Sequence, residues 1–137
     1  MITVQEPVFV YVEDDLPSRQ IVKVLLTRVM KFSNLTLFED SGNILSRLEG
    51  LNPPPTVFFL DIQMKPHDGY EVLHLLRGDR RYASATIIAM TANVMSNDVE
   101  QLKKEGFDGL IGKPIIKDTF PQLVERILEG KPVWFVP

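Results

Sequence analysis

Short apolar runs alternate along the chain with longer segments in which apolar residues recur at helical spacing. The runs are rich in β-branched and aromatic residues and end at polar or turn-forming residues, which is typical of buried strands. We predict strands over residues 8–12 (VFVYV), 34–38 (NLTLF), 56–60 (TVFFL), 85–90 (ATIIAM) and 108–112 (DGLIG).

Each predicted strand is followed by a segment of helical character. Pro17 lies near the start of the first such segment, where a helix tolerates proline, and Gly106 lies just past the end of the fourth, where helices often stop. We predict helices over residues 16–31, 41–51, 69–78, 96–105 and 117–129. Repeated strand–helix units predict an α/β protein with a five-stranded parallel sheet, doubly wound, with helices on both faces and right-handed crossovers.

The length of 137 residues suits one domain, which we expect over residues 1–129, with a C-terminal tail over residues 130–137. The tail carries Trp134 and Phe135, which have no place in the repeats. One hypothesis is that these side chains fold back onto an apolar groove or fray at the terminus. The other is that they form an apolar docking strip for a partner or for a second protomer, which would make the protein a homodimer.

Composition excludes several classes of protein. The chain has no cysteine, so it has no disulfide, no thiolate nucleophile and no cysteine-ligated zinc site. A net charge of −3 argues against nonspecific nucleic-acid binding, which depends on clustered lysine and arginine. We find neither a signal-peptide pattern nor a stretch approaching the roughly 20 apolar residues that span a bilayer. We therefore expect a cytoplasmic protein with neither a membrane nor a nucleic acid as its partner.

Reactive or charged side chains follow four of the predicted strands. Glu13-Asp14-Asp15 follows the first strand, Asp61 the third, Thr91-Ala92-Asn93 the fourth and Lys113-Pro114 the fifth. Ligands of open parallel sheets bind outside the carboxyl ends of the strands, so these residues should lie at one edge of the sheet. Asp15 is expected to cap the helix that follows it.

The chemistry of this edge follows from its charge. Glu13, Asp14 and Asp61 would crowd carboxylates together, and their repulsion would raise the pKa of at least one of them. A hard divalent cation relieves that repulsion, and oxygen ligands suit Mg²⁺. Beside the metal and the Lys113 ammonium, Asp61 becomes a candidate nucleophile toward a phosphoryl group. Thr91 could donate a hydrogen bond to a phosphoryl oxygen, and Lys113 could pair with another.

Four motifs, in their order and spacing, resemble the receiver domain of two-component response regulators. They are VYVEDD (residues 10–15), FFLDIQM followed by DGYE (58–64 and 68–71), IIAMTAN (87–93) and GLIGKP (109–114). The resemblance spans about residues 7–129 and implies a flavodoxin-like fold with strand order 2-1-3-4-5. It also implies that the Lys113–Pro114 peptide bond is cis.

The resemblance implies a role for each residue of the predicted site. Asp61 would be the phosphoacceptor, Thr91 the switch hydroxyl and Lys113 the lysine that pairs with the phosphoryl group. The Ala92 backbone would contact the phosphate. The implied Mg²⁺ ligands are Glu13, Asp14, Asp61 and the backbone carbonyl of Gln63.

Two positions depart from the family pattern. Lys65 stands where the family usually has proline, with Pro66 one residue later. Leu110 stands where an aromatic side chain often moves together with the switch hydroxyl. We therefore expect the output to travel through backbone shifts in residues 92–97 rather than through a threonine–aromatic pair.

The predicted function is a stand-alone, phosphorylation-dependent signalling switch, regulatory rather than enzymatic. A sensor histidine kinase or histidine phosphotransfer protein would donate the phosphoryl group. The signal would pass through a phosphorelay or through the surface around the fourth helix, the fifth strand and the fifth helix to a downstream protein. The alternatives are a phosphate-independent scaffold, a haloacid-dehalogenase-like phosphohydrolase and a flavodoxin-like cofactor binder. The phosphohydrolase would need an acidic residue at Gln63, and the cofactor binder would need phosphate-binding Ser, Thr and Gly where Glu13-Asp14-Asp15 stands.

Overall fold

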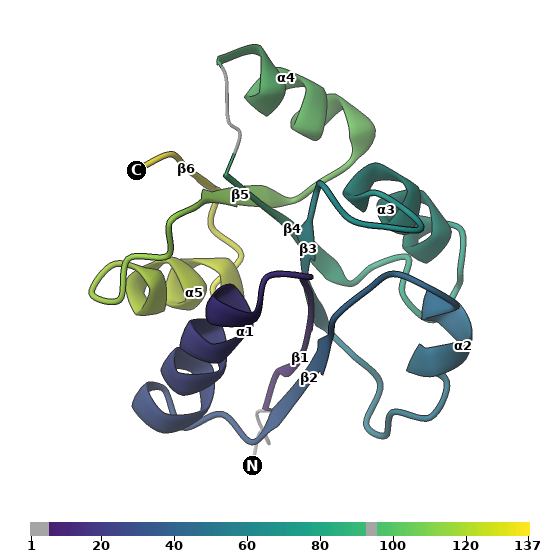
Figure 1. Ribbon diagram of the computed structural model, residues 1–137, viewed down its shortest axis with the longest axis horizontal. Helices are drawn as coiled ribbons and strands as arrows, with labels where there is room; N and C mark the ends of the chain where they lie inside the picture. The colour runs from purple at the N-terminus through teal and green to yellow at the C-terminus, as the bar shows by residue number, and fades with distance from the viewer. Residues whose placement is uncertain (1–5, 93–95) are drawn as a thin grey trace.

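A computed structural model of the chain describes residues 6–92 and 96–137. Its strands form one parallel sheet in the order β2-β1-β3-β4-β5-β6 (Figure 1). The strands are β1 (Val8–Val12), β2 (Asn34–Phe38), β3 (Val57–Asp61), β4 (Thr86–Thr91), β5 (Gly109–Gly112) and β6 (Val133–Phe135). The predicted parallel α/β fold and the order of its first five strands are confirmed.

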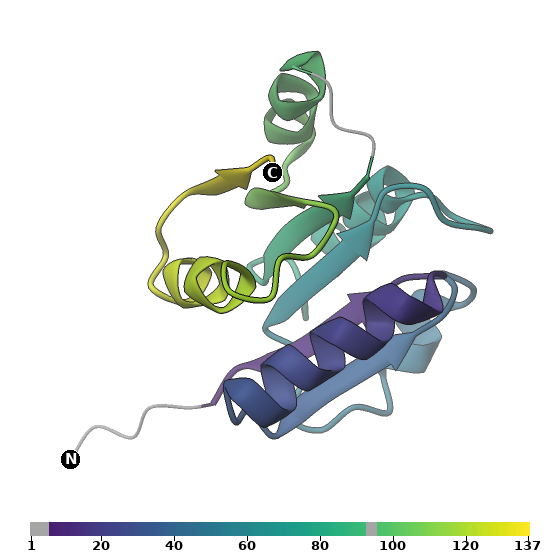
Figure 2. The same cartoon turned by 60° about the vertical axis from the view of Figure 1, so that its left-hand side comes forward.

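Helices cover both faces of the sheet (Figures 1 and 2). They are α1 (Leu16–Lys23), the π-helix η1 (Val24–Val29) that continues it, α2 (Ile44–Leu48), α3 (Gly69–Arg77), α4 (Ser96–Glu105) and α5 (Phe120–Leu128). The helices α1, η1 and α5 pack on one face, and α2, α3 and α4 pack on the other. Within the described ranges, none of the helices has the length and apolar character needed to cross a membrane.

The alternation of side chains along the strands divides the core into two layers. Phe9, Tyr11 and Phe59 pack with α1 and α5, whereas Val10 and Phe58 pack with α2 and α3. All five side chains are fully buried. Because β1 and β3 are covered on both faces, they are apolar throughout, and charge enters only where the strands end.

The first two helices differ from their predicted extents. The first begins where Asp15 accepts a hydrogen bond from the Ser18 N–H at 3.0 Å, as expected of its cap, but it becomes π-helical after Lys23. The second is shorter than residues 41–51, because Ser41 belongs to the preceding loop. The Ser41 hydroxyl donates to His67 O at 2.6 Å and accepts from His67 N at 2.8 Å, which ties that loop to the one after β3.

The sequence predicts five strands and the structure has a sixth, formed by the tail. In β6, Val133 is buried and Trp134 pairs with Leu110 of β5. A Cβ atom at Gly109 would lie 2.6 Å from Val133 O, and one at Gly112 would lie 2.8 Å from Pro137 Cδ. Glycines at both ends of β5 therefore make room for β6, which is too short to show a strand pattern of its own. The assignment of residues 130–137 to a separate tail stays a prediction.

Candidate functional site

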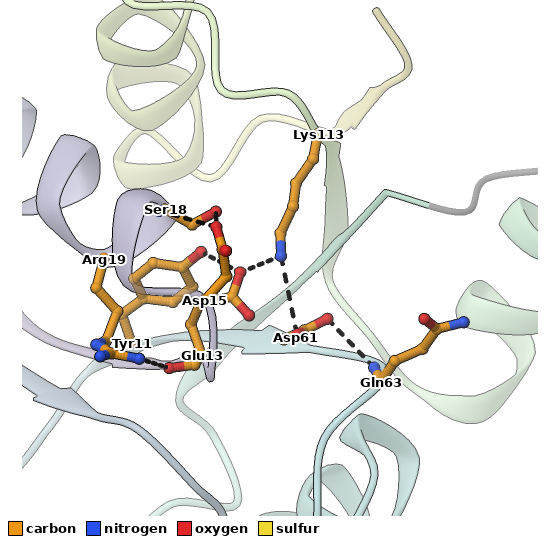
Figure 3. A network of polar contacts seen from close by, with 8 residues as sticks. All are labelled: Tyr11, Glu13, Asp15, Ser18, Arg19, Asp61, Gln63 and Lys113. Atoms are coloured by element: carbon orange, nitrogen blue, oxygen red, sulfur yellow. Dashed lines mark hydrogen bonds and ion pairs between the residues drawn. The ribbon is translucent and has the colours of Figure 1, made fainter.

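The fold brings together the residues that were predicted at the carboxyl ends of the strands. β1 and β3 are neighbours, with Val12 opposite Leu60, so Glu13 and Asp61 extend from adjacent strand ends. β4 and β5 are also neighbours, and the Lys113 N–H donates to Thr91 O at 2.9 Å just beyond the paired residues. The Lys113 side chain reaches back across this edge toward both carboxylates (Figure 3).

Three acidic side chains converge here. One carboxylate oxygen from each of Glu13, Asp14 and Asp61 lies within 4.8 Å of the others. Glu13 is fully buried, Asp61 is nearly so and Asp14 is exposed, so the cluster is open to solvent on one side. Glu13 Oε2 is buried and has no hydrogen-bond partner among the residues that the structure describes. A buried carboxylate oxygen without a donor beside two further carboxylates fits a divalent cation with oxygen ligands.

Lys113 is the cation that faces this cluster. Its ammonium donates to Glu13 Oε1 and lies 3.8 Å from Asp61 Oδ2. The Lys113–Pro114 peptide bond is cis, as the family resemblance implies. One ammonium offsets only part of the charge of three carboxylates, so a second positive group at this edge of the sheet would lower their repulsion.

Burial and mutual repulsion separate the pKa values of the two buried acids. Burial raises the pKa of Asp61 to about 8, and the nearby Glu13 carboxylate adds to this shift while Lys113 opposes it. Burial also acts to raise the pKa of Glu13. Interactions with Asp61, Lys113 and Tyr11 outweigh that effect and lower the Glu13 pKa overall. The pKa values of the two acids are thus moved apart, and a proton is bound more tightly at Asp61 than at Glu13.

The remaining predicted residues lie just past the end of β3 and at or just past the end of β4. The Gln63 N–H donates to Asp61 Oδ1 at 3.2 Å, and the Gln63 side chain extends away from the carboxylate (Figure 3). Thr91 is nearly buried at the end of β4 and lines a cavity of about 290 Å³ together with Gln63 and Tyr70. Ala92 follows Thr91 and is exposed. Asn93, which was expected at the same edge of the sheet, lies outside the described residues.

Sequence analysis missed two residues that touch Glu13. The Tyr11 hydroxyl donates to Glu13 Oε1 at 3.0 Å, and Arg19 Nη1 donates to Glu13 O at 2.6 Å (Figure 3). The sequence places Tyr11 in the apolar run of residues 8–12, which predicts a buried strand. Residues two apart in a strand share a face, so its spacing from Glu13 was a usable signal. Arg19 carried no such signal, because its contact depends on how the first turn of α1 lies over the end of β1.

Comparison with known sequences identifies the family. Residues 9–127 match the Response regulator receiver domain family. The chain is a response regulator receiver domain. Domains of this family are regulatory, take phosphoryl groups from histidine kinases and bind Mg²⁺ or Mn²⁺ at an acidic pocket. In this receiver domain, the Glu13–Asp14–Asp61 cluster is a group of acidic side chains that could hold such a cation.

Individual relatives of this receiver domain are distant. Stress response regulator protein 1 of the yeast Meyerozyma guilliermondii is 29% identical over 106 residues, which are 77% of this chain and 48% of that protein. The chain thus spans about half the length of this relative, and less of the proteins of the same name in two other yeasts.

Solved structures agree with the fold of the receiver domain. The chemotaxis response regulator CheY4 of Vibrio cholerae has a TM-score of 0.78 at 20% identity, with 90% of this chain and 99% of that chain covered. The Mn²⁺-bound form of the response regulator Rcp1 has a TM-score of 0.74 at 20% identity, with 89% of this chain and 94% of that chain covered. At these identities the likeness shows the fold alone.

Proposed function

We propose that this receiver domain is a phosphorylation-dependent signalling switch in which Asp61 accepts a phosphoryl group. The observation that carries the proposal is the environment of Asp61. It is a buried carboxylate at the end of β3, with the Lys113 ammonium 3.8 Å away and two further carboxylates within 4.8 Å. That arrangement combines a nucleophile, a cation and a set of oxygen ligands at one edge of the sheet. The donor is a sensor histidine kinase or a histidine phosphotransfer protein.

The transfer requires one bond to form and one to break. An Asp61 carboxylate oxygen attacks phosphorus, and an O–P bond forms as the P–N bond to the donor histidine breaks, its electron pair returning to the imidazole. Lys113 then pairs with one phosphoryl oxygen, and the Thr91 hydroxyl and the Ala92 N–H donate to others. Attack of water on phosphorus later releases inorganic phosphate and restores Asp61.

The acidic cluster would hold Mg²⁺ through Glu13, Asp14, Asp61 and the Gln63 carbonyl. The cation supplies positive charge against the charge that accumulates on the phosphoryl oxygens. The orphaned oxygen of Glu13 supports this assignment, because a cation would satisfy an atom that otherwise costs free energy to bury.

The added phosphoryl charge would bias the face formed by α4, β5 and α5 toward a downstream protein, or the group would pass onward in a relay. Slow self-phosphorylation and self-dephosphorylation would serve the switch and would not make the protein a turnover enzyme. We propose that the protein acts in the cytoplasm. Residues 1–129 form the receiver domain, and residues 130–137 are a C-terminal tail that extends it.

The test is intact mass after incubation with Mg²⁺ and acetyl phosphate. The wild type should gain one phosphoryl group, Asp61→Asn should gain none, and omission of Mg²⁺ should abolish the gain. Asp118→Asn is the matched control, because it makes the same change at an exposed loop residue outside the acidic cluster. A wild type that never gains mass, with acetyl phosphate or with a phosphorylated histidine donor, would indicate a phosphate-independent adaptor instead.

A further inference from the structure

The Tyr11 hydroxyl lies inside the protein and contacts the buried acid of the site. Tyr11 is fully buried in β1, and its hydroxyl donates to Glu13 Oε1 at 3.0 Å. Its ring packs edge-on against Phe59 of β3, with 6.3 Å between the ring centroids and 86° between the planes. Because the ring is held on all sides by the core, the hydroxyl has little freedom to leave Glu13.

The two oxygens of the Glu13 carboxylate have different surroundings. Oε1 accepts from both the Tyr11 hydroxyl and the Lys113 ammonium (Figure 3). Oε2 is buried and has no donor among the described residues. Two donors on one oxygen fix the rotation of the carboxylate, so that its other oxygen is left for a different kind of partner.

We propose that Tyr11 is a positioning residue for the divalent cation: its hydroxyl holds Glu13 Oε1 so that Oε2 is presented to the metal. The proposal deepens the proposed function and rests on its metal site. In metal sites, partners that hydrogen-bond to the ligands orient them and contribute to affinity although they never touch the metal.

Tyr11 has a role that Lys113 cannot fill. In the proposed reaction, Lys113 turns from Glu13 to a phosphoryl oxygen, so Glu13 Oε1 loses one of its donors in the phosphorylated state. The Tyr11 hydroxyl stays, because its ring belongs to the core and not to the surface. The hydroxyl should therefore matter more when Asp61 carries beryllofluoride, a phosphoryl mimic, than when it is unmodified.

The variant that tests this is Tyr11→Phe, which removes the hydroxyl and keeps the ring. Tyr82→Phe is a close control, since Tyr82 is also buried and packs edge-on against the neighbouring Phe58, with 5.7 Å between the centroids and 83° between the planes. Tyr82 belongs to the opposite core layer and precedes β4, away from the carboxyl ends of the strands. Tyr82→Phe thus removes the same hydroxyl group from a tyrosine in a similar aromatic pair that lies away from Glu13.

Mg²⁺ affinity is measured by calorimetry at a temperature at which circular dichroism shows every metal-free variant to be folded. Tyr11→Phe should weaken Mg²⁺ binding by about tenfold, the lower range seen when a ligand's hydrogen-bond partner is removed. Tyr82→Phe should bind like the wild type. In a Glu13→Ala background, Tyr11→Phe should have no further effect, because residue 13 then has no side-chain oxygen to accept from the Tyr11 hydroxyl. The loss should be larger when binding is measured through formation of the beryllofluoride complex.

Three results would overturn the inference: Tyr11→Phe binds Mg²⁺ as the wild type does, both phenylalanine variants lose affinity equally, or the Tyr11 effect persists in Glu13→Ala. A wild type that binds no Mg²⁺ at all would remove the proposed metal site itself. The wild-type titration thus separates failure of the proposed function from failure of the role of Tyr11.

Discussion

A buried carboxylate at the end of an apolar strand needs a compensating partner. For Asp61 the compensation in the metal-free protein is partial. Asp61 shares the Lys113 ammonium with Glu13, and burial raises the pKa of Asp61 to about 8. The buried carboxylates at this edge therefore lower the stability of the metal-free protein, and the proposed cation would offset that loss. Such a loss of stability is common at sites where residues are selected for function.

This cost predicts a pH-dependent difference between the wild type and Asp61→Asn without metal. The pKa of Asp61 rises from 3.8 to about 8 on folding, so the folded state holds the proton more tightly. The resulting stabilisation is complete below the unfolded pKa and is lost as the pH rises through about 8. Asp61→Asn lacks this loss, so its free energy of unfolding in EDTA should exceed that of the wild type by a margin that grows from pH 5 to pH 8. Urea unfolding across this range measures the margin.

Asp118→Asn, at an exposed site, should show no such trend, and addition of Mg²⁺ should reduce the margin for Asp61→Asn. A margin that is flat with pH, or one that shrinks as the pH rises, would contradict the buried, proton-holding Asp61.

At the scale of elements, the sequence predicts those strands whose apolar runs are long enough to be recognised as strands. β1, β3 and β4 lie inside the sheet between two layers of helices. Because both faces of such a strand are buried, its residues are apolar without interruption, and the run can be recognised in the sequence. Glu13, Asp61 and Lys113 could be placed because they stand at or just past the carboxyl ends of β1, β3 and β5, all of which lie inside the sheet. The contact of Tyr11 with Glu13 and the pairing of β6 depend on tertiary packing, which composition and periodicity do not encode.

The glycines of β5 predict how β6 can be dislodged. Alanine at Gly109 would bring its Cβ within 2.6 Å of Val133 O and 2.9 Å of Ile88 Cδ1, so β6 or the core must shift. Alanine at Gly112 would have its nearest contacts in the tail, with its Cβ 2.8 Å from Pro137 Cδ and 3.2 Å from Phe135 O. Each variant should lose about 1–3 kcal/mol of stability, the usual cost of overpacking. Trp134, the single tryptophan, should shift its emission to longer wavelength as β6 loosens.

Gly50→Ala is the control for both variants, because nothing lies within 4 Å of the added Cβ. Its stability and its Trp134 emission should match those of the wild type. Unchanged emission from both β5 variants would mean that β6 does not depend on these glycines.

At the scale of the whole molecule, β5 links the site to the face that carries the tail. Lys113 follows β5 directly, and Ile111, two residues earlier, pairs with Phe135 of β6. On the opposite face of the sheet, Lys103 Nζ of α4 lies 5.1 Å from the centroid of the ring of Trp134 in β6. A movement of Lys113 toward a phosphoryl group would therefore displace backbone that lies only two residues from Ile111, which pairs with β6.

Trp134 should report this coupling. Beryllofluoride with Mg²⁺ should change the intensity or wavelength of Trp134 emission in the wild type and leave Asp61→Asn unchanged. Formation of the adduct is checked separately by ¹⁹F NMR. An adduct that forms without any change in Trp134 emission would mean that the signal leaves the site by a route other than β5 and β6.

The most direct test of the account is to locate the phosphoryl group. The protein is treated with acetyl phosphate and Mg²⁺ and then reduced with borohydride, which converts an aspartyl phosphate to homoserine, and its peptides are mapped by mass spectrometry. The account predicts homoserine at residue 61, dependent on Mg²⁺, and unmodified aspartate at residues 14, 15 and 68. Homoserine at another position, or a phosphorylated protein in which Asp61 is intact, would contradict the claim that Asp61 is the phosphoacceptor.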